Sequence, residues 1–515
     1  MLRPLFSFPG GIKPDSHKDD SSRTPIAPAP LPERLTLPLR QSAGVMPLPT
    51  VRVGDRVKKG QVIASADKWV SASLHAPTSG KVADIGKYPM AHPSGLPALA
   101  IVIESDGLDE WRERQPLDWQ RLAPQAVRQY LQQSGVVGLG GALFPSHVKL
   151  DTETRIEELI INGAECEPYI TCDDRLMRER AAEIVSGVAL LRDFTGARQT
   201  LIAIENNKPE AIRAMRGAIS EHGENFAVVT LPTRYPAGSL RQLVYTLTGK
   251  RAPSNVLPTA MGVQCFNVAT AHSIWRAIVL GEPVVRRVVT VSGNVRAPGN
   301  WDAPIGMSMT ALLELSGTFP DTDGLIAGGP MMGLPLPLAT GAPLTKDSNC
   351  LIARSPRLFP PRPPESPCIR CTACAQVCPQ GLQPFELYWW SRARNFEKAA
   401  DYALAECIEC GCCAYVCPAS IPLVHYFRFA KGELAAAARE QKMADSARFR
   451  FEFRQFRIER EKAEKAEKLA RAAAAQAAKQ KSAAAVEAPA ASGEPAPMAS
   501  LKSHDQPCAP NPEPR

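Results

Sequence analysis

The order of apolar and polar positions divides this 515-residue chain into stretches of different character. In residues 31–110, short apolar runs are broken by glycine and proline, which predicts small β-strands. In residues 111–283, apolar runs alternate with helical patterns, which is typical of an α/β domain. The strands predicted there are Leu159–Ile161, Leu201–Ile204 and Ala227–Thr230.

The pattern changes again in the C-terminal half. Residues 284–353 contain a predicted strand at Val288–Gly293 and a predicted helix at Met309–Leu315. Residues 364–428 hold a helical pattern at Pro384–Glu406, whose aromatic side chains we assign to a small core.

Both ends of the chain lack this alternation. Residues 1–30 are rich in proline, serine and charge, and we expect an extended arm. Residues 429–481 are rich in alanine, lysine and glutamate, and pairs such as Glu461 and Lys465 support an exposed helix. This helix would dock on a partner or on its own domain, and the alternative is a solvated helix packed only at its start. Residues 482–515 are dominated by alanine, proline and serine, which predicts disorder.

Composition and charge narrow the range of functions. Hydrophobic residues make up 44% of the chain, enough for several packed cores. The net charge of +8 suits an acidic cofactor, an acidic partner or a membrane surface, and is too small to indicate nucleic acid. No run approaches the roughly 18 apolar residues that cross a bilayer, and the first residues do not resemble a signal peptide. We therefore expect a cytoplasmic protein.

Eight cysteines repeat one spacing. The pattern C-x2-C-x2-C-x3-C-P occurs at Cys368–Pro379 and again at Cys407–Pro418. Soft thiolates this close together suit iron–sulfur cubes, and in two-cluster ferredoxins the fourth cysteine of each run binds the other cluster. The predicted ligands are Cys368, Cys371, Cys374 and Cys417 for one 4Fe-4S cluster, and Cys407, Cys410, Cys413 and Cys378 for the second.

Zinc is the alternative for these cysteines. Structural zinc usually takes pairs of C-x2-C set well apart, so three cysteines at successive i+3 positions suit it poorly. A secreted disulfide framework is disfavoured by the length of the chain. Cys412, beside Cys413, is expected to point away from the cluster and not to bind iron.

A glycine-rich stretch, Gly138–Pro145, is followed by Lys149. Glycines allow close backbone approach by a flat or phosphorylated ligand, and a nearby lysine supplies charge. The stretch is not G-x-G-x-x-G, because Leu143 stands where the last glycine would be. Taken alone, a tight turn before a helix is as good an interpretation as a ligand loop.

Residues 53–82 resemble a lipoyl or biotinyl carrier domain through Val53–Ala64 and His75–Val82. Asp67 and Lys68 stand where carrier domains place the modified lysine, but the next residues depart from that pattern. We therefore expect a carrier-like β-sandwich used for packing, with Lys68 unmodified.

Taken in chain order, several motifs resemble the flavin- and NADH-binding subunit of respiratory complex I, and more closely the RnfC component of the Rnf/Rsx ion-translocating oxidoreductase complex. The resemblance covers roughly residues 5–460 and includes the two cysteine runs. The other stretches that carry it are Gly10–Ile12, Gly138–Pro145, Asn162–Tyr169, Gly249–Pro253, Phe266–Thr270 and Gly328–Gly333.

The resemblance implies cofactors and the residues that bind them. In this family the glycine loop and an Asn/Glu cluster hold FMN, and NADH stacks on the flavin. The implied flavin contacts are Gly138, Gly140, Gly141, Lys149, Asn162 and Glu165. Glu167 and Phe144 would face NADH, and Asn267 and Thr270 the FMN phosphate. The chain departs from its relatives at Leu143, and at Ser239 and Leu240, where they carry acidic residues.

The implied fold class is multidomain, α/β and α+β. It comprises a carrier-like β-sandwich (31–110), an α/β FMN/NADH domain (111–283), a β-grasp domain (284–353), an α-helical double 4Fe-4S ferredoxin domain (364–428) and a helical tail (429–481).

The implied role is that of a peripheral subunit on the cytoplasmic side of the inner membrane. It would pass electrons between NADH and membrane-embedded Rnf/Rsx subunits, with a ferredoxin-like protein as acceptor or donor. Two alternatives stay open: a soluble cobalamin-reductase-like flavin/iron–sulfur protein, and a flavin-free relay or scaffold subunit. The long tail favours the membrane complex over the soluble reductase.

Overall fold

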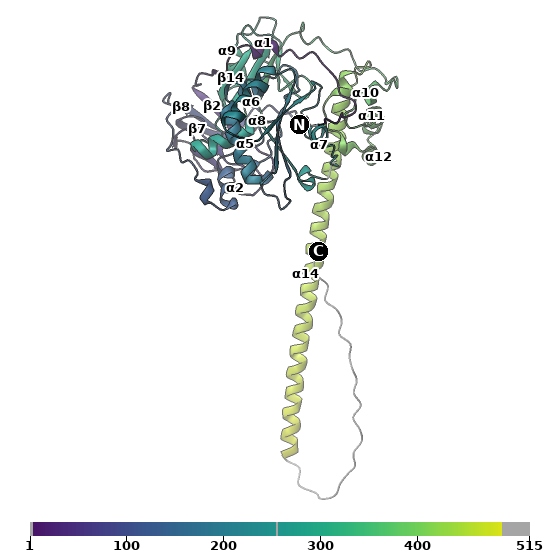
Figure 1. The fold of residues 1–515 in the computed structure, drawn as a ribbon. Helices are drawn as coiled ribbons and strands as arrows, with labels where there is room; N and C mark the ends of the chain where they lie inside the picture. Colours follow the sequence, from purple (N-terminus) through teal and green to yellow (C-terminus); the bar gives the residue numbers. More distant parts are fainter. Residues whose placement is uncertain (1–3, 254–255, 487–515) are drawn as a thin grey trace. The chain divides into compact units, whose positions relative to one another are not determined.

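The computed structural model describes residues 4–253 and 256–486 (Figure 1). Residues up to Leu434 form one compact unit, and residues from Ala435 form a second. The strands are β1 (Ala27–Pro28), β2 (Arg34–Pro38), β3 (Leu48–Pro49), β4 (Arg56–Val57), β5 (Val62–Ser65), β6 (Leu74–His75), β7 (Gly80–Tyr88), β8 (Ala98–Ser105), β9 (Glu158–Gly163), β10 (Gln199–Glu205), β11 (Ala227–Leu231), β12 (Val263–Asn267), β13 (Arg286–Gly293), β14 (Gly299–Pro304), β15 (Gly324–Ala327), β16 (Leu334–Leu336) and β17 (Cys350–Arg354).

The helices are α1 (Asp19–Ser22), η1 (Trp119–Arg121), α2 (Pro124–Gln133), α3 (Ser146–Lys149), α4 (Cys172–Glu179), α5 (Ala181–Thr195), α6 (Pro209–Glu221), α7 (Leu240–Thr248), η2 (Pro258–Met261), α8 (Val268–Trp275), η3 (Arg276–Leu280), α9 (Met309–Leu315), α10 (Ala373–Gln376), α11 (Pro384–Arg392), α12 (Phe396–Asp401), η4 (Leu404–Glu406), α13 (Cys412–Tyr415) and α14 (Leu423–Val486).

Two small antiparallel sheets make up the N-terminal β-region. Their strand orders are β2-β8-β7-β4 and β3-β5-β6. The turn that carries Lys68 is held against α2, because the Gln132 amide donates to the Lys68 carbonyl at 2.8 Å. The Ala43 amide donates to the Leu143 carbonyl at 2.9 Å, so this region also supports the glycine-rich loop.

The strands predicted at Leu159, Leu201 and Ala227 are confirmed as β9, β10 and β11 of a parallel sheet with the order β11-β10-β9-β12. Successive strands β9, β10 and β11 step to one side, and β12 then returns to pair with the other side of β9. Helix α5 packs between α6 and α8 beside this sheet (Figure 1). In open α/β sheets, ligands bind at the carboxyl ends of strands where the order reverses, here between β9 and β12.

The third sheet has the order β1-β14-β13-β17-β15-β16. The predicted helix Met309–Leu315 is confirmed as α9, which Ser308 caps through its hydroxyl. The expected extended arm contains the one-turn helix α1 and strand β1, which pairs with β14.

Lys346 connects this sheet to the two preceding regions. Its buried ammonium donates to the carbonyls of Ser73, at 3.1 Å, and Gly135, at 2.7 Å. Burial lowers the pKa of Lys346 from 10.5 to about 7. Below that pKa the folded protein carries a desolvated charge, which lowers the free energy of unfolding. This loss of stability disappears as the pH rises from about 7, where the folded protein releases the proton, toward 10.5, where the unfolded chain does.

We therefore expect stability to rise over this pH window, and Lys346→Met to flatten the rise because methionine does not titrate. Melting temperatures measured between pH 7 and pH 10 test this, with exposed Lys87→Met as the matched control. Equal slopes for wild type and Lys346→Met would contradict it.

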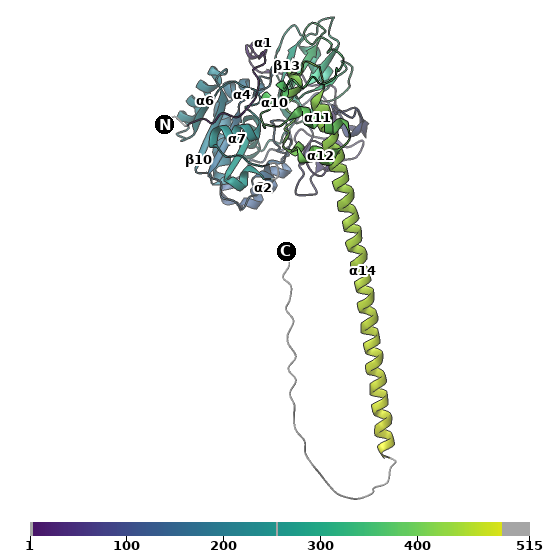
Figure 2. The same cartoon turned by 90° about the vertical axis from the view of Figure 1, so that its right-hand side faces the viewer.

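The region after the third sheet is built from short helices (Figure 2). The helical pattern at Pro384–Glu406 forms three pieces, α11, α12 and η4, instead of one helix. Arg394 and Ala403 stand at the two breaks with φ of 56° and 59°, a left-handed conformation that a helix cannot contain. Tyr388, Leu387 and Phe427 are buried at the centre of this region.

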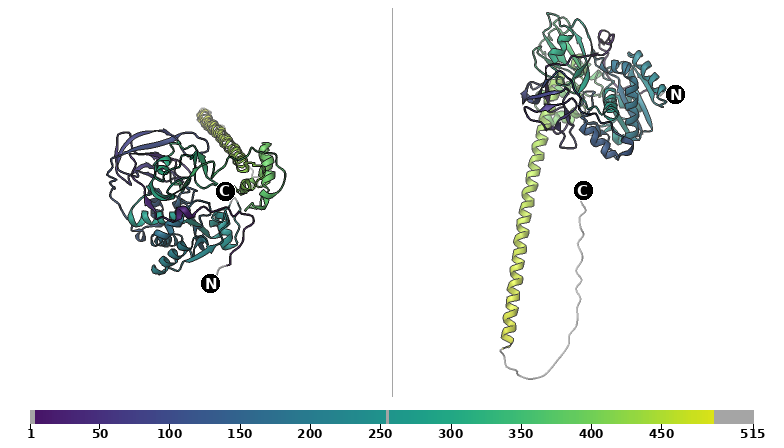
Figure 3. Two further views of the ribbon diagram at one scale, coloured as in Figure 1. Left: turned by 90° about the horizontal axis from the view of Figure 1, so that it is seen from above. Right: turned by 90° about the vertical axis from the view of Figure 1, so that its left-hand side faces the viewer.

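Helix α14 starts earlier than the predicted tail helix, at Leu423, and continues to Val486 (Figure 3). The remainder of the predicted disordered tail, residues 487–515, lies outside the described residues. Phe449 and Phe453 stack with ring centroids 6.4 Å apart, and both are exposed. Docking of this helix on a partner stays a prediction. In the part of the chain that the structure describes, no helix is both long and apolar enough to span a bilayer.

Candidate functional site

The eight cysteines of the two runs line two separate cavities. Cysteines 368, 371, 374 and 417 line the first, and cysteines 378, 407, 410 and 413 line the second. Each cavity thus combines three cysteines of one run with the fourth cysteine of the other. This grouping is the one that crossed ligation requires, and it is the observation on which the ligand assignment rests.

The backbone of both runs has the same local conformation. The residues on either side of the second cysteine, Arg370 and Thr372 in one run and Glu409 and Gly411 in the other, have positive φ. Left-handed residues beside right-handed ones turn successive N–H groups into one concavity, which suits an anionic cluster. Helices α10 and α13 then begin directly after these turns.

Burial makes free thiolates costly in these cavities. It raises the pKa of Cys374 and of Cys407 to about 11. A thiolate with little access to water needs a compensating cation, which the iron of a bound cluster supplies. The residues present therefore fit two 4Fe-4S clusters.

Cys412 departs from expectation. Its side chain is fully buried, lines the second cavity beside Cys410, and does not point away from it. Its sulfur is close enough to Cys410 to hydrogen-bond, which lowers the pKa of the Cys410 thiol.

The surroundings of the two cavities differ. Tyr235 of the α/β region donates its hydroxyl to the Cys410 carbonyl at 2.7 Å, and the Gln242 amide donates to the Pro379 carbonyl at 3.2 Å. The second cavity is therefore attached to the α/β region. At the first cavity, Cys371 is exposed and the Ile369 side chain is 69% exposed.

The glycine-rich loop closes on itself. The Gly138 amide donates to the Phe144 carbonyl at 2.8 Å, and the Leu143 amide donates to the Gly138 carbonyl at 3.1 Å. Leu143 has a φ of 49°, a conformation that glycine adopts without strain. Its side chain packs against the buried cluster of Ala72, Val137 and Leu139.

Two groups from other elements hold the loop in place. The Thr270 hydroxyl in α8 accepts from the Leu139 amide at 2.9 Å. The Arg287 guanidinium in β13 donates to the Leu139 carbonyl at 2.6 Å. At Gly140, a Cβ would lie 3.3 Å from that of Asn267, whereas a Cβ at Gly141 would meet no atom within 4 Å. The loop therefore has open space at Gly141, as a cradle for a flat ligand requires.

Asn162 and Asn267 are aligned in the parallel pair β9 and β12, next to the loop. The Asn162 amide donates to the Gly238 carbonyl at 2.9 Å. Asn267 caps α8 by accepting from two of its backbone amides, and its own amide donates to Asp173 at 2.6 Å. The start of α8 and the glycine loop thus lie together at the reversal in strand order, and they fit FMN.

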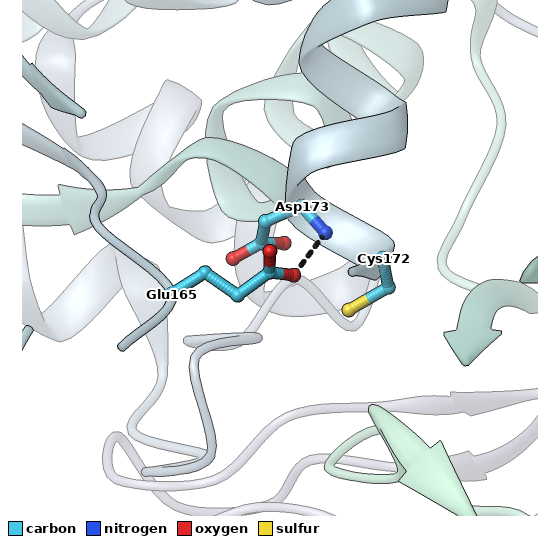
Figure 4. Close-up of side chains that lie close together, drawn as sticks. All are labelled: Glu165, Cys172 and Asp173. Atoms are coloured by element: carbon cyan, nitrogen blue, oxygen red, sulfur yellow. Dashed lines mark hydrogen bonds between the residues drawn. The ribbon is translucent and has the colours of Figure 1, made fainter. Parts of the chain in front are cut away.

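Glu165 lies at the end of β9 and caps α4. Its carboxylate accepts from the Asp173 amide at 2.7 Å (Figure 4). Burial raises the pKa of Glu165 to about 8, against the opposing effect of the Lys18 ammonium. Lys18, from the N-terminal arm, donates to the Glu165 carbonyl at 2.9 Å. Its role was missed in the sequence because the arm shows only scattered polar residues.

Figure 4 also shows Cys172 beside Glu165 and Asp173, with donor atoms all within 4.8 Å of one another. Three such atoms can hold a cation in principle. Both carboxylates already accept hydrogen bonds from within the chain, and burial raises the pKa of the Cys172 thiol well above its usual range. We therefore assign no metal to this group.

Three further predicted site residues have their own contacts. The Glu167 carboxylate accepts from the Met331 and Met332 amides at 3.2 and 3.0 Å, so it anchors the loop Gly328–Gly333. The Lys149 ammonium donates to the Cys265 carbonyl and lies over the Phe266 ring, 4.3 Å from its centroid. Phe144 is 37% exposed. The structure thus brings the glycines, Asn162, Asn267 and Thr270 together and engages Glu167 and Lys149 elsewhere.

Comparison with known families agrees with this arrangement. Residues 6–108 match the RnfC barrel sandwich hybrid domain, 131–276 the Nuo51 FMN-binding domain, 288–335 the SLBB domain and 367–421 the 4Fe-4S dicluster domain. These matches confirm a multidomain protein with FMN and 4Fe-4S clusters as cofactors.

Among curated proteins, the chain is 44% identical to the C component of the ion-translocating oxidoreductase complex (RnfC) of Haemophilus influenzae, over 89% of this chain and 70% of that protein. The chain belongs to the RnfC family. Its identity to the RnfC protein of Pectobacterium carotovorum is 46%, over 89% of this chain and 61% of the relative. For the RnfC protein of Pseudomonas aeruginosa the identity is 44%, over 89% and 59%.

Membership in the RnfC family confirms the predicted electron-transport function and the assignment as an oxidoreductase subunit. The chain also resembles a crystal structure of an NAD+-reducing nickel–iron hydrogenase, with 18% identity and a TM-score of 0.44 over 62% of this chain and 67% of that one. We draw nothing from so distant a likeness.

Proposed function

We propose that this RnfC protein passes electrons between NADH and the other subunits of its complex, by way of FMN and two 4Fe-4S clusters. Bound FMN supplies the conversion between a two-electron hydride donor and one-electron carriers. The contact between the α/β region and the second cysteine cavity, through Tyr235 and Cys410, is the observation that carries the proposal.

We infer the order of the two clusters from the surroundings of their cavities. The second cavity is held by the α/β region that contains the glycine loop, so we assign it to the cluster nearer the flavin. The first cavity has an exposed cysteine, Cys371, and an exposed Ile369, so we assign it to the cluster that faces the partner. That partner would be a membrane-embedded subunit or a ferredoxin-like protein, with the RnfC protein peripheral on the cytoplasmic side.

Each site residue has a proposed task. Gly138, Gly140 and Gly141 let the flavin approach the backbone, Asn162 and Glu165 contact the ring, and Asn267 and Thr270 set the phosphate end of the site. Lys149 would also contact the flavin, and Phe144 and Glu167 would face its NADH side. The domain bounds that go with these tasks are 31–110, 111–283, 284–353 and 364–428.

The test uses the full chain, with iron–sulfur clusters and FMN reconstituted. NADH is expected to bleach the visible cluster absorbance and to give low-temperature EPR signals from both clusters, as dithionite does. The control is the same protein without flavin, in which dithionite reduces the clusters and NADH does not. If dithionite reduces the clusters of the flavin-loaded protein and NADH does not, NADH is refuted as the donor and a relay subunit is favoured.

A further inference from the structure

A polar cavity of ≈ 310 Å³ opens at the carboxyl ends of β9, β10 and β11. This is within the range of roughly 300–1,000 Å³ that is common for small-molecule sites. Lys18 lines it, while the carboxylate of Glu165 is turned to the start of α4. The cavity therefore lies beside the candidate flavin site, and no glycine of the loop lines it.

The lining of the cavity is positively charged. Lys13 and Lys18 from the N-terminal arm and Arg234 from the segment after β11 contribute three cations. No carboxylate of the described residues contributes to the lining. The Lys18 ammonium is paired with the Glu165 carboxylate at 3.9 Å, so Lys13 and Arg234 supply the excess positive charge of the lining. Positive charge inside a concave surface favours an anionic ligand.

The uncharged polar groups of the lining also present donors. The Asn206 side-chain oxygen accepts from both the backbone amide and the hydroxyl of Thr233. The Asn207 side-chain oxygen accepts from the Lys208 ammonium at 3.0 Å. Because both oxygens are engaged within the chain, each amide offers its NH2 group to a ligand.

Helix α6 adds to the same preference. The residues Asn206 and Asn207 join β10 to α6, whose 13 residues begin at Pro209. The N-terminal cap of α6, Lys208, makes no side-chain hydrogen bond to the first turn. The partial positive charge of a helix N-terminus therefore faces the side of the cavity that the two asparagines line.

We propose that this cavity binds a phosphate group of a small phosphorylated molecule. Residues that carry ammonium, guanidinium and amide groups line it from the arm, from the end of β10 and from the end of β11, and a phosphate has enough acceptor oxygens to meet donors from all three segments. The phosphate belongs either to a dinucleotide that extends from the flavin site or to a separate metabolite.

The test is calorimetric titration of the full, cluster-loaded chain with inorganic pyrophosphate, and in parallel with NADH. Asn207→Asp replaces a donor by an acceptor of the same shape, and Lys13→Glu reverses an exposed charge. Each change should weaken pyrophosphate binding about tenfold or more. Lys87→Glu, on strand β7, makes the same charge change at a residue that does not line the cavity, and it should leave the affinity for pyrophosphate within about twofold.

Two outcomes overturn the proposal: wild-type protein that shows no saturable pyrophosphate binding, and binding that both cavity variants retain. Loss in both variants supports it. If NADH binding weakens in the same variants, the phosphate belongs to the dinucleotide; if only pyrophosphate binding weakens, it belongs to a separate metabolite. NADH-driven cluster reduction is a separate measurement, so failure of this site and failure of the proposed electron path are distinguishable.

Discussion

The double variant Cys378→Ala/Cys407→Ala is expected to lose about half of the roughly eight irons, whereas Cys378→Ala/Cys371→Ala is expected to lose nearly all of them. The reason is the grouping of the cysteines. Cys378 and Cys407 line the same cavity although they come from different runs, and Cys378 and Cys371 line different cavities although they come from the same run. Each lost ligand removes one corner of one cluster.

The pair of variants separates crossed from uncrossed ligation. If each run held its own cluster, Cys378→Ala/Cys371→Ala would keep about half of the iron and Cys378→Ala/Cys407→Ala would lose nearly all of it. Iron and acid-labile sulfide per chain, with EPR of the dithionite-reduced protein, give the count. The buried Cys350→Ala is a matched control that should keep all of the iron, because Cys350 lines neither cavity. Zinc in the isolated protein, in place of iron, would contradict both arrangements.

The same experiment extends to the order of the clusters. A variant that loses only the second cluster, such as Cys378→Ala/Cys407→Ala, should keep a first cluster that dithionite reduces. NADH should no longer reduce it, because the remaining cavity is the one with the exposed Cys371 and not the one attached to Tyr235.

The sequence predicted best the features that depend on short-range geometry. Three cysteines at successive i+3 positions place their sulfurs around one cube whatever the rest of the chain does. The strands of the α/β region were likewise visible as apolar runs, since both faces of a parallel sheet are buried. The helix at Met309–Leu315 was predicted to the residue because its apolar positions and its cap are both local.

Features that depend on distant contacts were not predictable. Lys18 binds the Glu165 carbonyl across 147 residues, and Glu167 binds the Met331 amide across 164 residues. Neither contact leaves a periodic signal in the sequence. The break of the pattern at Pro384–Glu406 depends on left-handed residues, Arg394 and Ala403, which are neither glycine nor asparagine and so give no turn signal.

The family resemblance predicted where the backbone of each motif lies better than it predicted which groups the side chains contact. Lys149 stands where a flavin contact is implied, yet its ammonium binds the Cys265 carbonyl and lies over Phe266. Glu167 stands where an NADH contact is implied, yet its carboxylate holds the loop Gly328–Gly333. A motif fixes where the backbone runs, and the side chain then takes the partners that the fold supplies.

Gly329→Ala is expected to destabilise the protein by about 1–3 kcal/mol and to slow NADH-driven reduction of the clusters. A Cβ at Gly329 would lie 2.4 Å from the Glu167 carboxylate oxygen and 2.6 Å from its carbon, so either the loop or Glu167 must move. Moving it breaks the hydrogen bonds from the Met331 and Met332 amides and leaves a buried carboxylate without its donors.

The effect should reach the second cysteine cavity through Met331. A Cβ at Gly411, in the cysteine run, would lie 2.8 Å from the Met331 carbonyl oxygen, so the two loops are in close backbone contact. Met331 also packs against the cluster of Tyr235, Cys410 and Cys412. A shift of the loop Gly328–Gly333 therefore loosens the connection between the α/β region and the second cluster.

The measurement is a thermal melt together with stopped-flow reduction by NADH and by dithionite. Reduction by dithionite should stay at the wild-type rate, because the first cavity remains accessible from solvent at Cys371. Gly217→Ala in α6 is the matched control: its Cβ would meet no atom within 4 Å, and a helical glycine replaced by alanine gains about 1 kcal/mol. If Gly329→Ala keeps wild-type stability and wild-type kinetics of reduction by NADH, the close contact between the loop and Glu167 is not required. The proposed connection between the flavin and the second cluster would then lose its support.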